Sequence, residues 1–157
     1  MLHVGNPTTV HELREIAKKF TPAILCIVET QIDKIRVEKL KGELGYDSSY
    51  VVSSDGRSGG LGLFWNDEIK LKVSGYSKYH IDAMIDNLGP SAWRLTCVYG
   101  EAQVPERYKT WDTLRDLAGS IHSPWVVMGD FNEVLHLREH DGVGQRSQGQ
   151  IDASGVW

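Results

Sequence analysis

The chain has 157 residues, a length that fits one domain with a single hydrophobic core. Its 17 basic and 21 acidic residues give a net charge of −4. Proteins that depend on non-specific contacts to nucleic-acid phosphates are usually basic, so this composition argues against a simple nucleic-acid-binding module. No stretch reaches the ~18 consecutive apolar residues of a membrane span. The first residues have neither a basic start nor a long apolar run, so we expect no membrane association and no secretory signal.

The first predicted element is an amphipathic helix. Asn6 is a suitable N-cap and Pro7 a suitable first helical residue. A capping box formed by Thr9 and Glu12 is an alternative start. The apolar residues that then share one helical face are Val10, Leu13, Ile16, Ala17 and Phe20.

A strand and a second helix follow. Residues 23–28 are a continuous apolar run that predicts a strand buried on both faces, with Glu29 at its exit. Residues 31–44 predict a moderately amphipathic helix that ends near Gly45.

The middle of the chain is typical of short strands separated by turn residues. Lys70 and Lys72 alternate with apolar residues, as in a half-exposed strand. The predicted strands cover residues 50–53, 61–65, 69–73, 79–85 and 93–99.

The last predicted elements are a helix over residues 105–121 and a buried strand over residues 124–128. We expect Gly129 to break this strand just before Asp130 and Asn132. The order of helices and strands indicates packed sheets with helices outside, an α/β sandwich.

The cysteines, Cys26 and Cys97, lie in apolar runs. We expect both to be buried, unpaired strand residues of a protein in a reducing compartment. The expected location is therefore intracellular, either nuclear or cytoplasmic.

Two apolar strands end in acids, one at Glu29 and the other at Asp130, with Asn132 two residues further on. In open α/β architectures the carboxyl ends of strands line the functional crevice. Mg²⁺ needs only one or two carboxylates besides water and phosphate oxygens. Taken singly, each acid is as compatible with a helix cap or a solvated strand end.

The string Gly129-Asp130-Phe131-Asn132 resembles the GDFN signature of the endonuclease/exonuclease/phosphatase superfamily. Further segments agree in the same order, and together they resemble the endonuclease of plant non-LTR (LINE-type) retrotransposon polyproteins. These segments are residues 22–30, 57–65, 80–82 and 93–100, and the helix that contains Trp111.

The resemblance implies a four-layer α/β/β/α sandwich of the deoxyribonuclease-I type and cleavage of phosphodiesters with Mg²⁺, or alternatively Mn²⁺. DNA is the implied ancestral substrate. By matching motif, Glu29 resembles the family's metal-binding glutamate. Asp130 resembles the aspartate that assists the attacking water, and Asn132 resembles the asparagine that contacts the phosphate. Tyr99 matches a position that faces the scissile phosphate, or else it is an aromatic that closes a strand end. Apart from the resemblance, Arg57 and Arg107 are candidates for contacts to the backbone of a nucleic acid.

The chain also departs from this family pattern. The Trp-Asn pair of the family's first strand is replaced by Met1–Val4, and the chain stops at Trp157, before the family's closing Asp-His pair. None of the histidines present is assigned that role. We therefore expect residues 1–157 to form a single, incomplete domain truncated at both ends, with adjoining polyprotein sequence covering its sheet edges. A catalytically inactive remnant is the alternative function, and a phosphatase or lipid phosphodiesterase of the same superfamily is a third.

Overall fold

The computed structural model describes residues 7–28, 30, 34–53, 60–86, 89–120 and 122–133. These residues belong to two compact units, which are described separately. The first unit lies within residues 1–99 and 122–129, and the second within residues 100–121 and 130–157. Across the described ranges, no helix is both long and apolar enough to cross a membrane.

Two helices belong to the first unit. Helix α1 spans Pro7–Phe20. Its start at Pro7 confirms the first of the two predicted helix starts, while the Asn6 cap lies outside the described residues. Thr9 is a buried residue inside the helix, so the alternative capping-box start is wrong. Helix α2 spans Lys34–Leu44 and is followed by Gly45 at φ 81°, a left-handed conformation that ends helices at glycine.

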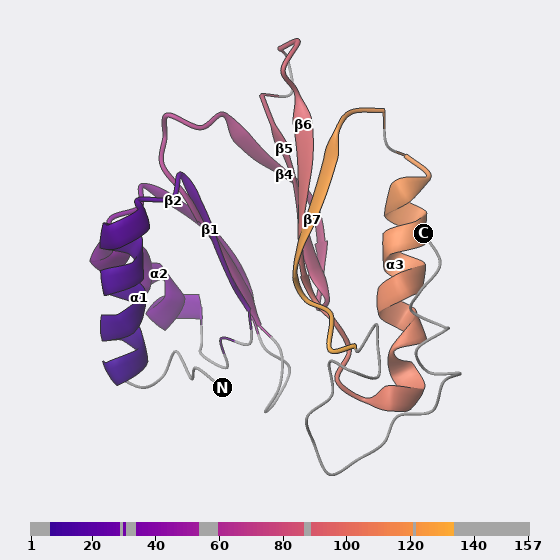
Figure 1. The fold of residues 1–157 in the computed structure, drawn as a ribbon, viewed down its shortest axis with the longest axis horizontal. Helices are drawn as coiled ribbons and strands as arrows, with labels where there is room; N and C mark the ends of the chain where they lie inside the picture. Colours follow the sequence, from indigo (N-terminus) through magenta and orange to yellow (C-terminus); the bar gives the residue numbers. More distant parts are fainter. Residues whose placement is uncertain are drawn as a thin grey trace. The chain divides into compact units, whose positions relative to one another are not determined.

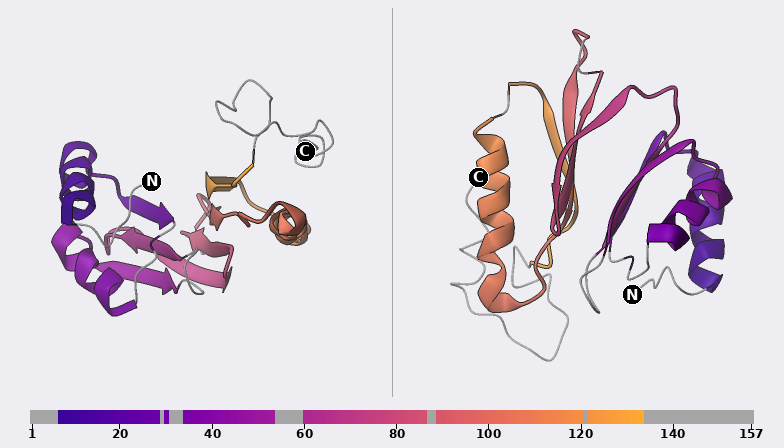
Figure 2. Two further views of the ribbon diagram at one scale, coloured as in Figure 1. Left: turned by 90° about the horizontal axis from the view of Figure 1, so that it is seen from below. Right: turned by 180° about the vertical axis from the view of Figure 1, so that it is seen from behind.

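Sheet 1 has three strands in the order β1-β3-β2, all antiparallel to their neighbours. One face of β1 contributes Ile27 to a core shared with the helices, and Phe64 of β3 lies in the same core. The other face of β1 contributes Cys26 to a second core, so β1 is covered on both sides as predicted. Figures 1 and 2 show α1 and α2 together against one face of this sheet. The strands are β1 (Ile24–Val28), β2 (Ser48–Val52) and β3 (Leu61–Trp65).

Sheet 2 has four strands in the order β4-β5-β6-β7. The first three are antiparallel, with a register shift in β4 between Val73 and Gly75. Strand β7 runs parallel to β6, because the Arg94 N–H donates to Pro124 O at 2.8 Å near their starts, whereas Val98 and Gly129 meet near their ends. The strands are β4 (Leu71–Ser77), β5 (His80–Ile85), β6 (Trp93–Tyr99) and β7 (Trp125–Asp130).

The two sheets face each other across the second core. Besides Cys97, the most deeply buried members of this core are Leu61 and Leu63 from sheet 1 and Ile81, Ala83 and Leu95 from sheet 2. With α1 and α2 on the outer face of sheet 1, this arrangement confirms the expected α/β sandwich.

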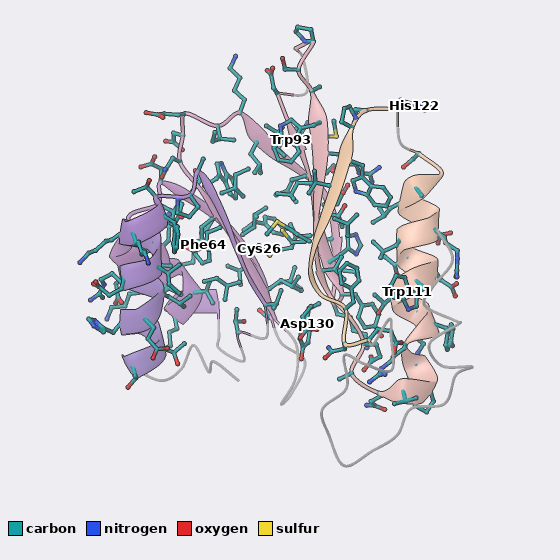
Figure 3. The ribbon with its side chains drawn as sticks, in the orientation of Figure 1. Cys26, Phe64, Trp93, Trp111, His122 and Asp130 are labelled. Atoms are coloured by element: carbon teal, nitrogen blue, oxygen red, sulfur yellow. The ribbon has the colours of Figure 1, made fainter. Side chains whose placement is uncertain are left out.

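Both cysteines are free thiols in this second core, Cys97 fully buried and Cys26 half-buried. Figure 3 labels Cys26 on the side of sheet 1 opposite to Phe64. A hydrogen bond between the two thiols, together with burial, raises the pKa of Cys26 far above its ordinary value. The Cys26 thiol is therefore held in the neutral form.

Strand β7 differs from its prediction in two ways. It continues through Gly129 to Asp130 instead of breaking, because glycine tolerates the φ of 143° found at Gly129. It is also not buried on both faces, since Val126 is 47% and Met128 41% exposed. Among the described strands, β7 lies at the edge of sheet 2 and has β6 as its single neighbour.

A buried polar network joins all four strands of sheet 2. The Asp82 carboxylate, 2% exposed, accepts hydrogen bonds from Arg94 Nε at 2.8 and 3.0 Å, Thr96 Oγ1 at 2.7 Å and Ser74 Oγ at 2.8 Å. The indole N–H of Trp125 donates to Thr96 Oγ1 at 2.9 Å. Burial raises the pKa of Asp82, but the hydrogen bonds and the Arg94 charge outweigh it and hold that pKa below its ordinary value.

The second unit contains helix α3, which spans Tyr108–Ala118 and follows a 3₁₀ turn over Val104–Glu106. The predicted helix began at Pro105, which instead lies inside the 3₁₀ turn. The helix is therefore shorter than predicted at both ends. Its buried residues are Thr110, Trp111 and Leu114.

Candidate active site

Asp130 is the last residue of β7, and its side chain is exposed (Figure 3). The backbone N–H of Asn132 donates to Asp130 Oδ1 at 2.8 Å. An Asp side chain that accepts from the backbone N–H two residues later forms an Asx-turn. The turn fixes one oxygen of the carboxylate and leaves lone pairs on both oxygens for other donors.

Asn132 occupies a left-handed conformation at φ 51°, which asparagine tolerates better than most residues. Its side-chain Nδ2 donates to Gly100 O at 2.6 Å. In the opposite direction, the Gly100 N–H donates to Asp130 O at 2.7 Å. The loop formed by residues 130–133 is therefore bonded to the residue that directly follows β6.

Gly100 is needed at this contact because it has no side chain. A Cβ at this position would overlap with the backbone of Phe131. Only a glycine lets the two backbone segments approach this closely.

Two side chains of the loop contact the start of α3. The ring of Phe131 stacks on Trp111 with centroids 5.7 Å apart and planes within 11°. Glu133 Oε1 accepts a hydrogen bond from Arg107 NH1 at 3.2 Å, and these side chains are only 5% and 11% exposed. Figure 3 labels Trp111 on α3.

The turn between Gly100 and α3 is also fixed by hydrogen bonds. The Glu101 N–H donates to Thr110 Oγ1 at 2.9 Å, and Thr110 is 2% exposed. The Gln103 N–H donates to Glu101 Oε1 at 3.0 Å. The loop is thus attached to a segment that is itself held at several points.

Tyr99, the last residue of β6, belongs to the first unit. Its N–H donates to Tyr79 O at 2.8 Å, and its side chain, 7% exposed, is part of the core between the sheets. The geometry is compatible with both sequence interpretations, a phosphate-facing residue and an aromatic that closes the strand.

Glu29, the predicted metal ligand, lies outside the described residues. The residue after it, Thr30, is 1% exposed, and its N–H donates to Gly60 O at 3.3 Å. Its Oγ1 is buried without a hydrogen-bond partner in the described part of the chain. A buried hydroxyl of this kind is often satisfied by an ordered water.

The donor chemistry fits a hard divalent cation held by few protein oxygens. The described ranges contain no group of three or more His, Cys, Asp or Glu side chains that could hold a metal together. Mg²⁺ at phosphate sites is bound through one or two carboxylates plus water and phosphate oxygens, so it does not need such a group. Asp130, an exposed carboxylate, suits that pattern.

The family model for endonucleases, exonucleases and phosphatases matches residues 2–148 of the chain. The chain belongs to the endonuclease/exonuclease/phosphatase family. The family's members are hydrolytic nucleases and phosphodiesterases. No curated protein sequence matches the chain.

Solved structures share the fold. An AP endonuclease from Archaeoglobus fulgidus is similar with a TM-score of 0.70 and 17% identity, over 93% of this chain and 63% of that one. The AP endonuclease LMAP from Leishmania major has a TM-score of 0.67 and 13% identity, over 98% and 62% of the two chains. The endonuclease domain of TRAS1, a telomere-specific non-LTR retrotransposon, has a TM-score of 0.56 and 13% identity, over 82% and 55%. The chain thus spans less than two thirds of each of these structures.

The remaining charged or titratable residues that the sequence singled out are Arg57, Arg107 and His80. Arg107 is paired with Glu133, which gives it a structural partner inside the protein. Arg57 lies outside the described residues. His80 is 8% exposed, with Nδ1 2.7 Å from Ser77 Oγ, and burial lowers its pKa.

Sequence reasoning missed the contacts that hold the loop of residues 130–133, hereafter the GDFN loop, namely those to Gly100, Trp111 and Arg107. One local pattern could have suggested two of these contacts. Arg107 and Trp111 are four residues apart, a spacing that places two side chains on the same face of a helix. The hydrogen bonds to Gly100 join residues 32 positions apart and leave no local pattern in the sequence.

Proposed function

We propose that the chain is a Mg²⁺-dependent phosphodiester hydrolase that cleaves DNA, with Mn²⁺ as a substitute metal. Family membership and the fold shared with nucleases support this assignment. The observation that carries it is the docked GDFN loop, which presents an exposed Asp130 carboxylate with one oxygen already oriented. The segments that resemble plant LINE-type endonucleases favour that branch of the family.

Asp130 would orient and deprotonate the attacking water. The Asn132 N–H fixes the Asp130 carboxylate, and a carboxylate has about four lone-pair sites, so capacity remains to accept a hydrogen bond from water. General-base assistance of this kind is worth typically ~10²–10⁴-fold in rate.

Asn132 would act in two ways. Its backbone N–H, which donates to Asp130 Oδ1, would orient that carboxylate, and its left-handed conformation supports this role. Its side-chain amide has two N–H donors, of which one is used on Gly100 O. The second would donate to a phosphoryl oxygen, where charge builds up during the reaction.

Glu29 would hold the divalent cation, and the Tyr99 hydroxyl would donate a hydrogen bond to a phosphoryl oxygen. The bound cation would supply electrostatic stabilisation of the phosphate. The net charge of −4 also favours a cation between the protein and a polyanionic substrate. We further propose that adjoining polyprotein sequence covers the exposed apolar residues of the edge strand β7, Val126 and Met128.

The direct test is nicking of supercoiled plasmid by the purified chain with Mg²⁺, with Mn²⁺ and with EDTA. We expect conversion to open circles with either metal and none with EDTA. Parallel assays with RNA, an inositol phosphate and a phosphomonoester separate a DNA endonuclease from the other activities of the family. A folded, soluble chain that cleaves none of these substrates would refute the proposal and favour an inactive remnant.

A further inference from the structure

The orientation of Asp130 depends on the residues that follow it. Its Oδ1 is held by the Asn132 N–H, and Asn132 in turn is held in a left-handed conformation by its bond to Gly100 O. Rotation of the loop at residues 131–133 would therefore move the Asp130 carboxylate. Whatever anchors these residues also sets the direction of the carboxylate.

Two anchors flank Asn132, one on each side in the sequence. Phe131 stacks on Trp111 of α3, and Glu133 pairs with Arg107, the residue just before α3. A stacked ring fixes the plane of Phe131 but still permits sliding within that plane, because offset arrangements are similar in energy. A second, directional contact at Glu133 removes this freedom.

The Glu133–Arg107 pair differs from the Asp112–Arg115 pair of α3 in its burial. Asp112 and Arg115 are 57% and 55% exposed, and they pair within the helix at 2.9 Å. Glu133 and Arg107 are 5% and 11% exposed, and they join the loop to the helix across 26 residues. Exposed pairs contribute little, whereas removing one partner of a buried pair leaves the other charge uncompensated.

Arg107 is itself held in place. Its NH2 donates to Ala102 O at 3.2 Å while NH1 donates to Glu133. The planar guanidinium thus connects the turn after β6 to the end of the GDFN loop. A lysine at this position would offer a point charge without the fork of donors that makes both bonds.

We propose that Arg107 and Glu133 are positioning residues that clamp the GDFN loop and thereby hold the Asp130 carboxylate in its reactive orientation. The proposal rests on the proposed function of Asp130. Neither residue needs to contact the substrate. Their removal should lower kcat more than it raises KM, because a displaced catalytic group weakens the reaction step rather than substrate binding.

The first test compares Glu133→Gln with Asp112→Asn, both carboxylate-to-amide changes in an ion pair of the second unit. We expect Glu133→Gln to lower kcat for plasmid nicking about 10²-fold at nearly unchanged KM, the size of effect that a small misplacement produces. Asp112→Asn should leave kcat unchanged. Arg107→Gln should match Glu133→Gln, the double variant should lose little more than either, and Arg107→Lys should recover part of the loss. Equal kcat values for Glu133→Gln and Asp112→Asn would overturn the proposal.

The second test does not require activity. Hydrogen exchange measured by NMR at the Gly100 amide, which is bonded to Asp130 O, reports whether the loop stays docked. We expect Glu133→Gln and Arg107→Lys to lose protection at Gly100 while amides of β5 keep theirs. A lowered kcat with unchanged protection at Gly100 would overturn the positioning role. If the wild-type chain cleaves no substrate, the proposed function fails, and the exchange at Gly100 still decides whether the ion pair holds the loop.

Discussion

Replacing Asp82 by Asn should strongly destabilise the protein. Asp82 is 2% exposed, and its carboxylate has Arg94 and Thr96 on β6 and Ser74 on β4 as partners. The Arg94 side chain is 10% exposed, so an amide at position 82 would leave its charge buried and uncompensated. Removing one partner of a buried ion pair costs about 3–5 kcal/mol.

This cost is large against the total stability of a domain, which is typically about 5–15 kcal/mol. For a protein of this size, 1 kcal/mol shifts Tm by about 2–4 °C. The lower figure of about 3 kcal/mol therefore corresponds to a fall of about 6–12 °C. Exposed pairs are worth about 0–1 kcal/mol, so Asp112→Asn is the matched control, in an ion pair that is more than half exposed.

The assay is urea unfolding followed by tryptophan fluorescence, together with a thermal scan. The effect should depend on pH with a defined sign. The pKa of Asp82 is lowered in the folded protein, so its contribution is present above the unfolded-state pKa and is lost as the pH falls through the folded-state pKa. The difference between wild type and Asp82→Asn should shrink accordingly in acid. A destabilisation no larger than that of Asp112→Asn, or one independent of pH in this range, would refute the reasoning.

Three further predictions concern Gly100, His80 and Cys26. Gly100→Ala should destabilise the protein by about 1–3 kcal/mol because its Cβ would overlap with loop backbone, whereas Gly119→Ala, which meets only ordinary contacts, should be neutral or stabilising in the same thermal scan. The NMR titration midpoint of His80 should lie below its ordinary value because burial disfavours the charged ring, and Asp82→Asn should lower it further, since the Asp82 charge raises it; a higher midpoint in the variant would contradict this. Alkylation of Cys26 by iodoacetamide should be slow in the folded protein and fast in urea, because burial and the hydrogen bond to the other core thiol keep it neutral; equal rates would contradict its placement.

The elements that the sequence predicted well are those whose own pattern determines them. Helix α1 has apolar residues at helical spacing and a proline at its start, and β6 is a short segment rich in strand-forming residues between turns. That Asp130 and Asn132 lie close together also followed from the sequence, because they are two residues apart, whereas their catalytic roles stay predictions. The Asx-turn joins these two residues.

The features that the sequence did not predict depend on distant neighbours. Val126 and Met128 read as buried because their run is apolar, yet they lie on an edge strand, and an apolar pattern cannot show where a strand lies in its sheet. The continuation of β7 through Gly129 requires an unusual φ. Glycine permits this φ, but the presence of a glycine in the sequence does not predict it. The clamp on the GDFN loop joins residues 26 positions apart, so no periodicity reveals it.

The measurement that tests the central claim most directly is the rate of plasmid nicking by Asp130→Asn, compared with Asp112→Asn and wild type at equal folded concentration. The substitution keeps the size of the side chain but removes the base. We predict a loss of about 10²–10⁴-fold for Asp130→Asn and none for Asp112→Asn. An Asp130→Asn variant that nicks DNA at the wild-type rate would contradict the assignment of this loop as the catalytic centre.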